Sequence, residues 1–265
     1  MSLRGRLHSL DADWNDLVND PHLRERLERL CEEAPHDSSL AASVSRPLAP
    51  LVDQEVWAAG VTYWRSRMAR AEESADSGGG DFYDRVYDAE RPELFLKATA
   101  HRVVGTGEPM HLRSDSRWIV PEPELVLVVA RCGTITGFTI GNDLSCRDIE
   151  GANPLYLPQA KTFDRCAAVG PGILVSRSLP PPDTTIRLVI RRHARTICDD
   201  STTLSRMKRT PEELVSWLVR DNSFPSGCLL MTGTGIVPPT DLCLQAGDRV
   251  EISIDGIGRL CNRMR

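Results

Sequence analysis

The sequence lacks several features that mark whole classes of protein. Its eight cysteines include no Cys-x-x-Cys pair, which disfavours zinc ribbons and thioredoxin-like redox sites. It has neither the apolar run of about 18 residues that a membrane span needs nor the apolar core of a signal peptide. It has no P-loop and no Gly-x-Gly-x-x-Gly motif after a strand, so nucleotide chemistry is not indicated. We therefore expect a cytoplasmic protein with reduced, mostly buried cysteines.

Positive charge is also in short supply. The 265 residues include 32 Lys and Arg against 37 Asp and Glu, which gives a net charge of −5. This balance disfavours a nucleic-acid binder that relies on a basic surface. The 41% of hydrophobic and 26% of charged residues are typical of globular proteins. We expect no nucleic-acid or membrane partner, and a main domain with a small appendage.

The first 50 residues are predicted to form that appendage, which is helical. Asp20 and Pro21 predict the start of a helix that ends at Glu33, and residues 34–50 form a connector. The main domain then covers residues 51–265. Near its start, three glycines at 78–80 follow a charged helix predicted over 65–74. They indicate either the joint of a mobile lid or an ordinary surface loop.

Beyond residue 118 the pattern is mainly β. Strands are predicted over 125–129, 135–140, 172–175 and 185–190. A capping box at Thr210 starts one late helix, which is followed by a strand over 228–231 and a terminal hairpin. Many short strands with few helices predict an α+β fold whose sheet is closed or strongly curled.

Two carboxylates directly precede the apolar strand at 125–129. Glu122 and Glu124 are two residues apart on an extended segment, so they point to one face. Their charges repel unless a cation lies between them. Asp143 ends the next strand, and an antiparallel return can bring it close. Oxygen ligands alone suit Mg2+, Mn2+ or Ca2+. The alternative is that both glutamates are solvated and Asp143 caps a turn.

Two further segments have the composition of a ligand site. Lys161 lies in an apolar stretch interrupted by prolines, where it could neutralise a substrate carboxylate or an enolate. The alternative is a surface lysine in a loop. Thr232, Gly233 and Thr234 follow a strand and offer hydroxyl and N–H donors to a substrate, although turns of this composition are common.

Together these motifs resemble the fumarylacetoacetate hydrolase (FAH) family over about residues 56–265. The matching elements are Glu122-x-Glu124, Asp143 in the run 141–148, Lys161 in the run 160–164, and residues 232–234. The resemblance implies a β-rich FAH catalytic fold with a rolled, barrel-like mixed sheet. It also implies a divalent metal on Glu122, Glu124 and Asp143, Lys161 beside a 2-oxo acid substrate, and a homodimer or homotetramer.

A finer resemblance is to the branch that dehydrates keto-deoxy sugar acids. It is carried by residues 60–63, 71–74, 83–87, 91–95 and 148–156. The acylpyruvase branch has a lid histidine and glutamate that activate water, and residues 63–68 contain no histidine. The resemblance implies that a 2-keto-3-deoxy pentonate loses water through a metal-bound enolate, with Mg2+ as the expected ion.

Candidates for the acid and base of this reaction are Lys161, Glu93 and Glu73. Glu93 is favoured over Glu73 because it precedes an apolar segment where burial can raise its pKa. Alternative reactions are hydrolysis of an acylpyruvate or fumarylacetoacetate, decarboxylation of oxaloacetate and isomerisation of a dienoate. A non-enzymatic alternative is a metal-stabilised protein that binds a 2-oxo acid without turnover.

Overall fold

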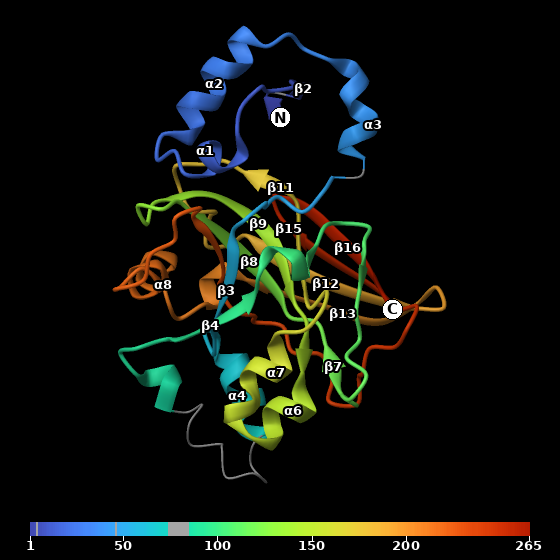
Figure 1. Cartoon of the computed structure of the whole chain (residues 1–265). Helices are drawn as coiled ribbons and strands as arrows, with labels where there is room; N and C mark the ends of the chain where they lie inside the picture. Colours follow the sequence, from blue (N-terminus) through green and yellow to red (C-terminus); the bar gives the residue numbers. More distant parts are fainter. Residues whose placement is uncertain (4, 46, 74–84) are drawn as a thin grey trace.

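Two curled β-sheets pack around a common core in the computed structural model, which describes all residues except 4, 46 and 74–84 (Figure 1). This arrangement confirms the predicted α+β fold with a strongly curled sheet. The larger sheet has seven strands, in the spatial order β4 (Glu93–Ala98), β3 (Glu55–Gly60), β14 (Cys228–Met231), β8 (Pro123–Val129), β9 (Ile135–Asp143), β11 (Ala167–Leu174) and β5 (Val103–Val104).

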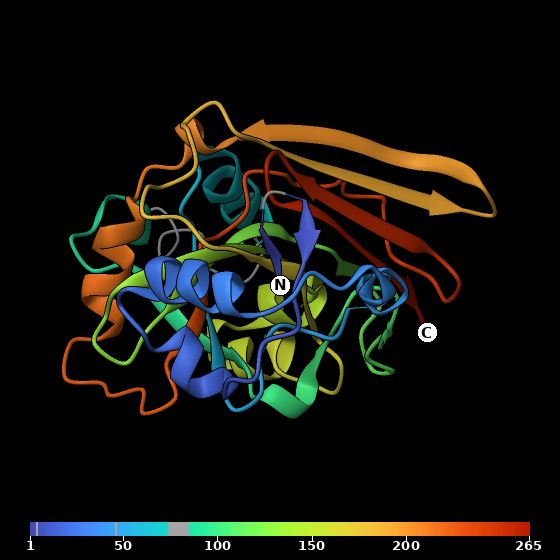
Figure 2. The same cartoon turned by 90° about the horizontal axis from the view of Figure 1, so that it is seen from above.

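The smaller sheet has five strands and a hairpin that extends beyond the body of the molecule (Figure 2). Its spatial order is β13 (Arg195–Thr203), β12 (Thr185–Arg192), β15 (Arg249–Ile254), β16 (Gly258–Met264) and β6 (Pro109–Met110). A further two-stranded pair joins β7 (Ile119–Val120) to β10 (Ser145–Cys146).

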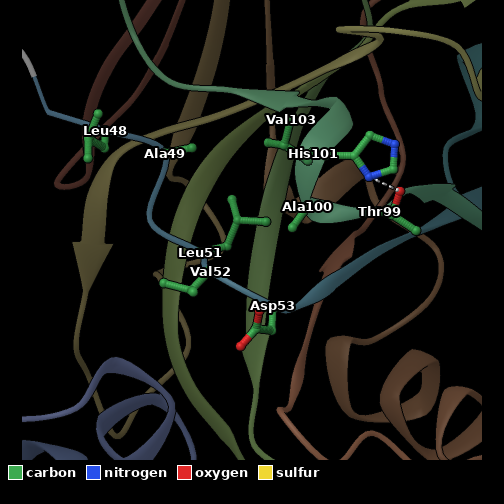
Figure 3. A pocket seen from close by; sticks show the side chains of 9 residues that line it. All are labelled: Leu48, Ala49, Leu51, Val52, Asp53, Thr99, Ala100, His101 and Val103. Carbon is green, nitrogen blue, oxygen red and sulfur yellow. Dashed lines mark hydrogen bonds between the residues drawn. The ribbon is translucent and has the colours of Figure 1, made fainter.

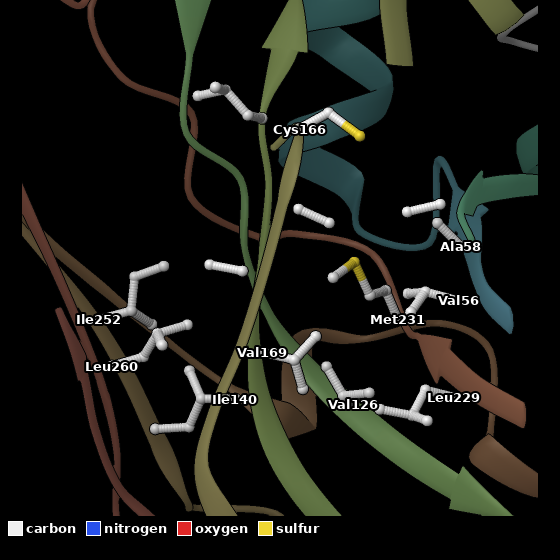
Figure 4. Packing of buried hydrophobic residues seen from close by; sticks show 14 of the residues in the cluster. Val56, Ala58, Val126, Ile140, Cys166, Val169, Leu229, Met231, Ile252 and Leu260 are labelled. Carbon is white, nitrogen blue, oxygen red and sulfur yellow. The ribbon is translucent and has the colours of Figure 1, made fainter. Parts of the chain in front are cut away.

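The core lies between the two sheets. Every residue of β8 is buried, as expected for an apolar strand that is covered on both faces. Ile252 and Leu260 of the smaller sheet approach Ile140 and Val169 of the larger one (Figure 4). Burial of these side chains holds the sheets together, because each contributes roughly 1.5–3 kcal/mol. All eight cysteines are free, as predicted, and five of them are buried.

One pairing within the larger sheet joins distant parts of the chain. β3 runs parallel to β14, with Ala58 opposite Met231. The chain therefore leaves both strands at the same edge of the sheet. There the Thr62 hydroxyl donates to the Thr232 carbonyl at 2.7 Å, across 170 residues of sequence.

Three helices gather at one end of the sheets (Figure 1). The helical segments of the main domain include α4 (Trp64–Glu73), η3 (Ala100–Arg102), α6 (Arg147–Ala152), η4 (Pro154–Tyr156), α7 (Leu157–Lys161), η5 (Leu204–Arg206) and α8 (Pro211–Leu218). α4, α6 and α7 form the gathered group, and Thr210 caps α8 as predicted, accepting from Glu213 N at 3.1 Å. Within the described residues, no helix has the length and apolar character of a membrane span.

The N-terminal segment contains β1 (Ser2–Leu3), β2 (Arg6–Leu7), α1 (Trp14–Val18), α2 (Leu23–Glu33), η1 (Ser38–Leu40) and α3 (Ala41–Val44). The two short strands were not predicted. α2 begins later than predicted, because Asp20 accepts from His22 N in a turn before the helix. α1 is tied to the larger sheet, since the Thr136 hydroxyl donates to Val18 O at 3.2 Å. The domain boundary near residue 50 stays a prediction.

Candidate metal and substrate site

Three buried carboxylates meet at one end of the β8–β9 hairpin. Glu122, Glu124 and Asp143 are each at most 4% exposed, and each offers an oxygen within 4.8 Å of the others. Glu124 pairs with Gly141 in the antiparallel register, which places Asp143 beside Glu122, and Asp143 N donates to Glu122 O at 3.0 Å. The sequence predicted this proximity. Their binding of a metal ion stays a prediction.

Lys161 brings positive charge to this cluster from the last residue of α7. Its Nζ lies 2.5 Å from Glu122 Oε2 and 3.3 Å from Asp143 Oδ2. It also donates to Ser145 Oγ at 2.6 Å. The lysine is buried, so the alternative of a surface lysine is wrong. The carboxylates thus occupy a place where a cation is stabilised.

Among the described residues, two more cations contact the cluster, and the sequence analysis missed both. Lys97 Nζ lies 2.8 Å from Asp143 Oδ1 and also donates to the backbone carbonyls of Leu144 and Lys161. Arg147 Nη2 lies 2.7 Å from Glu122 Oε1. Lys97 stands in the apolar run of β4, which is the same signal that pointed to Lys161. Arg147 stands within the run 141–148 that was matched for Asp143.

A β-bulge explains how Lys97 reaches the cluster. The pairing of β3 with β4 shifts register between Val56 and Trp57, which lie opposite Ala98 and Leu96. Lys97 is therefore the extra residue of the bulged strand, and such residues can turn a side chain to a new direction. Its neighbour Leu96 is exposed, whereas Lys97 is fully buried.

Burial dominates the electrostatics of Glu124. It raises the pKa of this carboxyl well above the ordinary 4.5, and the nearby charges of Asp143 and Glu122 raise it further. Glu124 Oε2 also accepts from Gly233 N at 2.5 Å. A buried group of this kind is stabilised by a proton or by a cation. Within the described part of the chain the potential ligands are all carboxylate oxygens, which fit Mg2+, Mn2+ or Ca2+ and not a soft metal.

The loop after β14 supports Glu124. Gly233 has a φ of +90°, and a Cβ there would lie 2.0 Å from Thr62 Oγ1, so only glycine fits. The Thr232 hydroxyl donates to Leu125 O at 3.0 Å, and that of Thr234 donates to Ile236 O at 3.2 Å. Both hydroxyls are thus bound to backbone carbonyls here. Substrate binding by Thr232, Gly233 and Thr234 stays a prediction.

Glu93 begins β4 on the same face as Phe95, because side chains alternate along a strand. The Phe95 ring centre lies 5.5 Å from Lys161 Nζ. Glu93 is half-buried, and its carboxylate lies against Gly60, where a Cβ would be 2.0 Å from Glu93 Oε2. Glu93 stands two residues before Phe95. It therefore faces the same side of β4, the side that borders the carboxylate cluster.

Other predicted features lie partly or wholly outside the described residues. Glu73 is the last residue of α4, and the structure does not describe its side chain. The three glycines at 78–80 and the run 74–84 around them are not described at all. The lid proposed for this segment is therefore untested.

A pocket of about 580 Å³ lies away from the carboxylates (Figure 3). Segments 48–53 and 99–103 line it, and the titratable side chains among the described lining residues are Asp53 and His101. His101 is paired with Thr99 at 3.1 Å. This pocket offers no group of charges comparable to the buried cluster, so we place the candidate site at Glu122, Glu124 and Asp143.

Comparison with known proteins agrees with the resemblance found in the sequence. The chain is 45% identical over 264 residues to the probable 2-keto-3-deoxyxylonate dehydratase of Haloferax volcanii, covering 97% of this chain and 90% of the relative. It is 44% identical over 221 residues to the 2-dehydro-3-deoxy-D-arabinonate dehydratase of Saccharolobus solfataricus, covering 82% of this chain and 72% of the relative.

The fold has equally clear relatives among solved structures. One is 2-keto-3-deoxy-D-arabinonate dehydratase complexed with magnesium and 2,5-dioxopentanoate, with a TM-score of 0.83 and 38% identity. That match covers 98% of this chain and 92% of the other. The model of the fumarylacetoacetate hydrolase C-terminal domain matches residues 64–265. The chain therefore belongs to the fumarylacetoacetate hydrolase family, as the sequence predicted.

Proposed function

We propose that this protein is a metal-dependent hydro-lyase that removes water from a 2-keto-3-deoxy sugar acid, most directly a pentonate. The observation that carries the proposal is the buried cluster of Glu122, Glu124, Asp143 and Lys161. It occurs in a chain that shares 45% identity with a probable keto-deoxy acid dehydratase. The absence of histidine from α4 supports dehydration over hydrolysis, because a hydrolase must activate a water molecule.

Glu122, Glu124 and Asp143 would hold the metal ion, and Mg2+ is the ion we propose. Three carboxylates provide the hard oxygen ligands that this ion prefers. Bound there, it would supply Lewis acidity toward the carboxylate and keto oxygens of a 2-oxo acid. Mn2+ offers the same ligand preference and is the natural substitute in a binding experiment.

The side chains around the cluster have distinct tasks in this proposal. Lys161 places its ammonium group among the carboxylates and would stabilise the negative oxygen of an enolate. Arg147 holds Glu122 through its guanidinium group. Glu93 would accept the proton from C3 of the substrate, since it is half-buried beside the site. Glu73 is the second candidate for this proton transfer.

A product assay tests the proposal. The protein is offered 2-keto-3-deoxy pentonates, an acylpyruvate and oxaloacetate with Mg2+, and the products are identified by mass spectrometry with an EDTA control. We expect a metal-dependent loss of 18 mass units, one water, from a keto-deoxy acid only. Cleavage of the acylpyruvate or loss of CO2 would show that the protein catalyses a different reaction of the family. Binding of a 2-oxo acid with no turnover would favour the non-enzymatic alternative.

The family resemblance also leads us to propose a homodimer or homotetramer. Light scattering coupled to size-exclusion chromatography measures the mass directly. A protomer of 29.4 kDa gives well-separated values for the monomer, dimer and tetramer. A monomer at all protein concentrations would contradict this part of the proposal.

A further inference from the structure

Tyr63 carries a buried hydroxyl that the mechanism above does not use. The side chain is 1% exposed, and among the described residues its hydroxyl has no hydrogen-bond partner. Almost all buried polar groups in folded proteins have a partner, and leaving one unpaired is destabilising. A hydroxyl enclosed in this way can donate to a molecule that binds beside it.

The backbone before Tyr63 is held in an unfavourable conformation. Val61 has a φ of +53°, which is rare and strained for a β-branched residue. Hydrogen bonds hold both the side chain and the backbone of Thr62 in place. Its hydroxyl donates to Thr232 O at 2.7 Å, and its carbonyl accepts from Lys208 N at 2.9 Å. Strain that is maintained by such contacts is typical of functional sites.

The loop that follows β14 holds both the Tyr63 ring and Glu124. A Cβ on Gly235 would lie 2.5 Å from the Tyr63 ring, so the ring packs directly on the backbone of this loop. Two residues earlier, Gly233 N donates to Glu124 Oε2 at 2.5 Å. The phenol is therefore placed on the Glu124 side of the carboxylate cluster, whereas Lys161 and Arg147 bind Glu122.

Burial keeps this phenol protonated. Burial raises the pKa of Tyr63, and the Glu124 carboxylate raises it further. Tyr63 is thus a neutral donor that has no acceptor among the residues the structure describes. The cations near Glu122 suit the anionic oxygens of a 2-oxo acid, and a neutral O–H donor suits an uncharged hydroxyl that must leave as water.

We propose that Tyr63 touches the substrate and donates its proton to the hydroxyl that leaves C4. This inference rests on the proposed dehydratase function. In the step, a base takes the C3 proton, the resulting electron pair forms the C3=C4 double bond, and the C4–O bond breaks. The Tyr63 proton completes the departing water. The phenolate then recovers a proton from the base that took one from C3, so the protein returns to its starting state.

The test separates proton removal at C3 from loss of the C4 hydroxyl. Tyr63→Phe removes only the hydroxyl and keeps the ring on Gly235. In D2O with Mg2+, NMR follows exchange of the C3 protons and formation of the dehydrated product. We expect dehydration to fall by about 10²-fold, the usual contribution of a general acid, while C3 exchange stays within about threefold of the wild type.

A second substrate and a control variant sharpen the test. Chloride leaves without a proton, so the 4-chloro analogue should react with Tyr63→Phe within about threefold of the wild-type rate. Tyr87→Phe keeps a ring that packs against Trp64 in an edge-to-face contact, and it should change neither rate. Thermal unfolding confirms that both variants are folded.

Two results would overturn the assignment of Tyr63. One is dehydration by Tyr63→Phe within about threefold of the wild type, and the other is an equal loss of exchange and dehydration. A wild-type protein that exchanges C3 protons without losing water gives a different pattern. That pattern would refute the proposed dehydratase function first, and the assignment with it.

Discussion

In the described part of the chain, a glutamate lies among cations both in the buried cluster at Glu122 and in a second cluster at Glu251. In the buried one, Glu122 lies 2.5 Å from Lys161 and 2.7 Å from Arg147. In the other, Glu251 lies on the outer face of the five-stranded sheet. Its side chain is 13% exposed, but its ion-pair partners among the described residues are arginines that are 41–65% exposed and 3.5–3.7 Å away: Arg191, Arg249 and Arg259.

The two clusters contain similar residue types but differ in how far water reaches their charged groups. Water and salt screen the arginines around Glu251, so each pair contributes at most about 1 kcal/mol. The cluster at Glu122 has no such screening, and each charge there depends on its neighbours. Removing one buried charge should therefore change function or stability far more than removing one exposed charge.

The largest effect is expected for Glu122→Gln. The change removes one carboxylate from the candidate metal ligands while keeping the shape of the side chain. We expect kcat/KM to fall by about 10³-fold or more, which corresponds to about 4 kcal/mol, together with weaker Mn2+ binding measured by calorimetry. The matched control is Glu251→Gln, which should keep full activity. Equal activities of the two variants would refute the ligand assignment.

The next effect concerns the stability of the metal-free protein. Lys97→Met keeps an apolar side chain of similar length but removes the cation at Asp143 Oδ1. Because a buried carboxylate then loses a partner, we expect the free energy of unfolding to fall by about 3 kcal/mol. Urea denaturation in EDTA measures this value. Arg249→Met is the exposed counterpart, and a loss as large as that of Lys97→Met would remove the distinction between the clusters.

A smaller effect is expected in the pH dependence of stability. The folded protein raises the pKa of Glu124, so above the ordinary value of 4.5 it binds more protons than the unfolded chain does. The unfolding free energy contributed by this group therefore falls as the pH rises through that window, by about 1.4 kcal/mol for each unit of pKa difference. We expect Glu124→Gln to become relatively more stable than the metal-free wild type as the pH rises from 5 to 8. Parallel curves would contradict this.

The smallest effect is expected for Glu251→Gln itself. Its exposed partners should limit the change in unfolding free energy to about 1 kcal/mol or less. Raising the salt concentration from about 0.05 M to about 1 M should reduce this difference in unfolding free energy, because dissolved ions screen the exposed pairs more strongly. A larger change that persists in salt would show that the Glu251 cluster behaves as a buried one.

The comparison also explains what the sequence could predict. Glu122 and Glu124 are found by spacing, and Asp143 by the hairpin that follows them, because all of this geometry is local. The burial of Lys161 depends on α7 packing at the sheet end, and the sequence indicated it through resemblance. Lys97 was missed because a bulge turns it inward, and bulges have no clear sequence pattern.

Long-range pairing set the other limit. The pattern predicted β14 as a strand but not its parallel pairing with β3, which brings Thr62 to Thr232. The two short strands at the N-terminus also escaped the prediction, because two residues are too few to show alternation. Tyr63 was matched only within the run 60–63 that carries the resemblance. Residue spacing does not reveal that its hydroxyl is buried without a partner among the described residues.

The central position of β14 has a consequence for synthesis and folding. This strand lies between β3 and β8, and β3 is made some 170 residues earlier. On the ribosome, β3 and β8 emerge without the strand that separates them, and closing such a long loop is slow. The Glu124 carboxylate acquires its Gly233 partner only after β14 inserts. The candidate site is therefore completed only when β14 is in place, so chains that end before β14 carry its charged residues without a formed site.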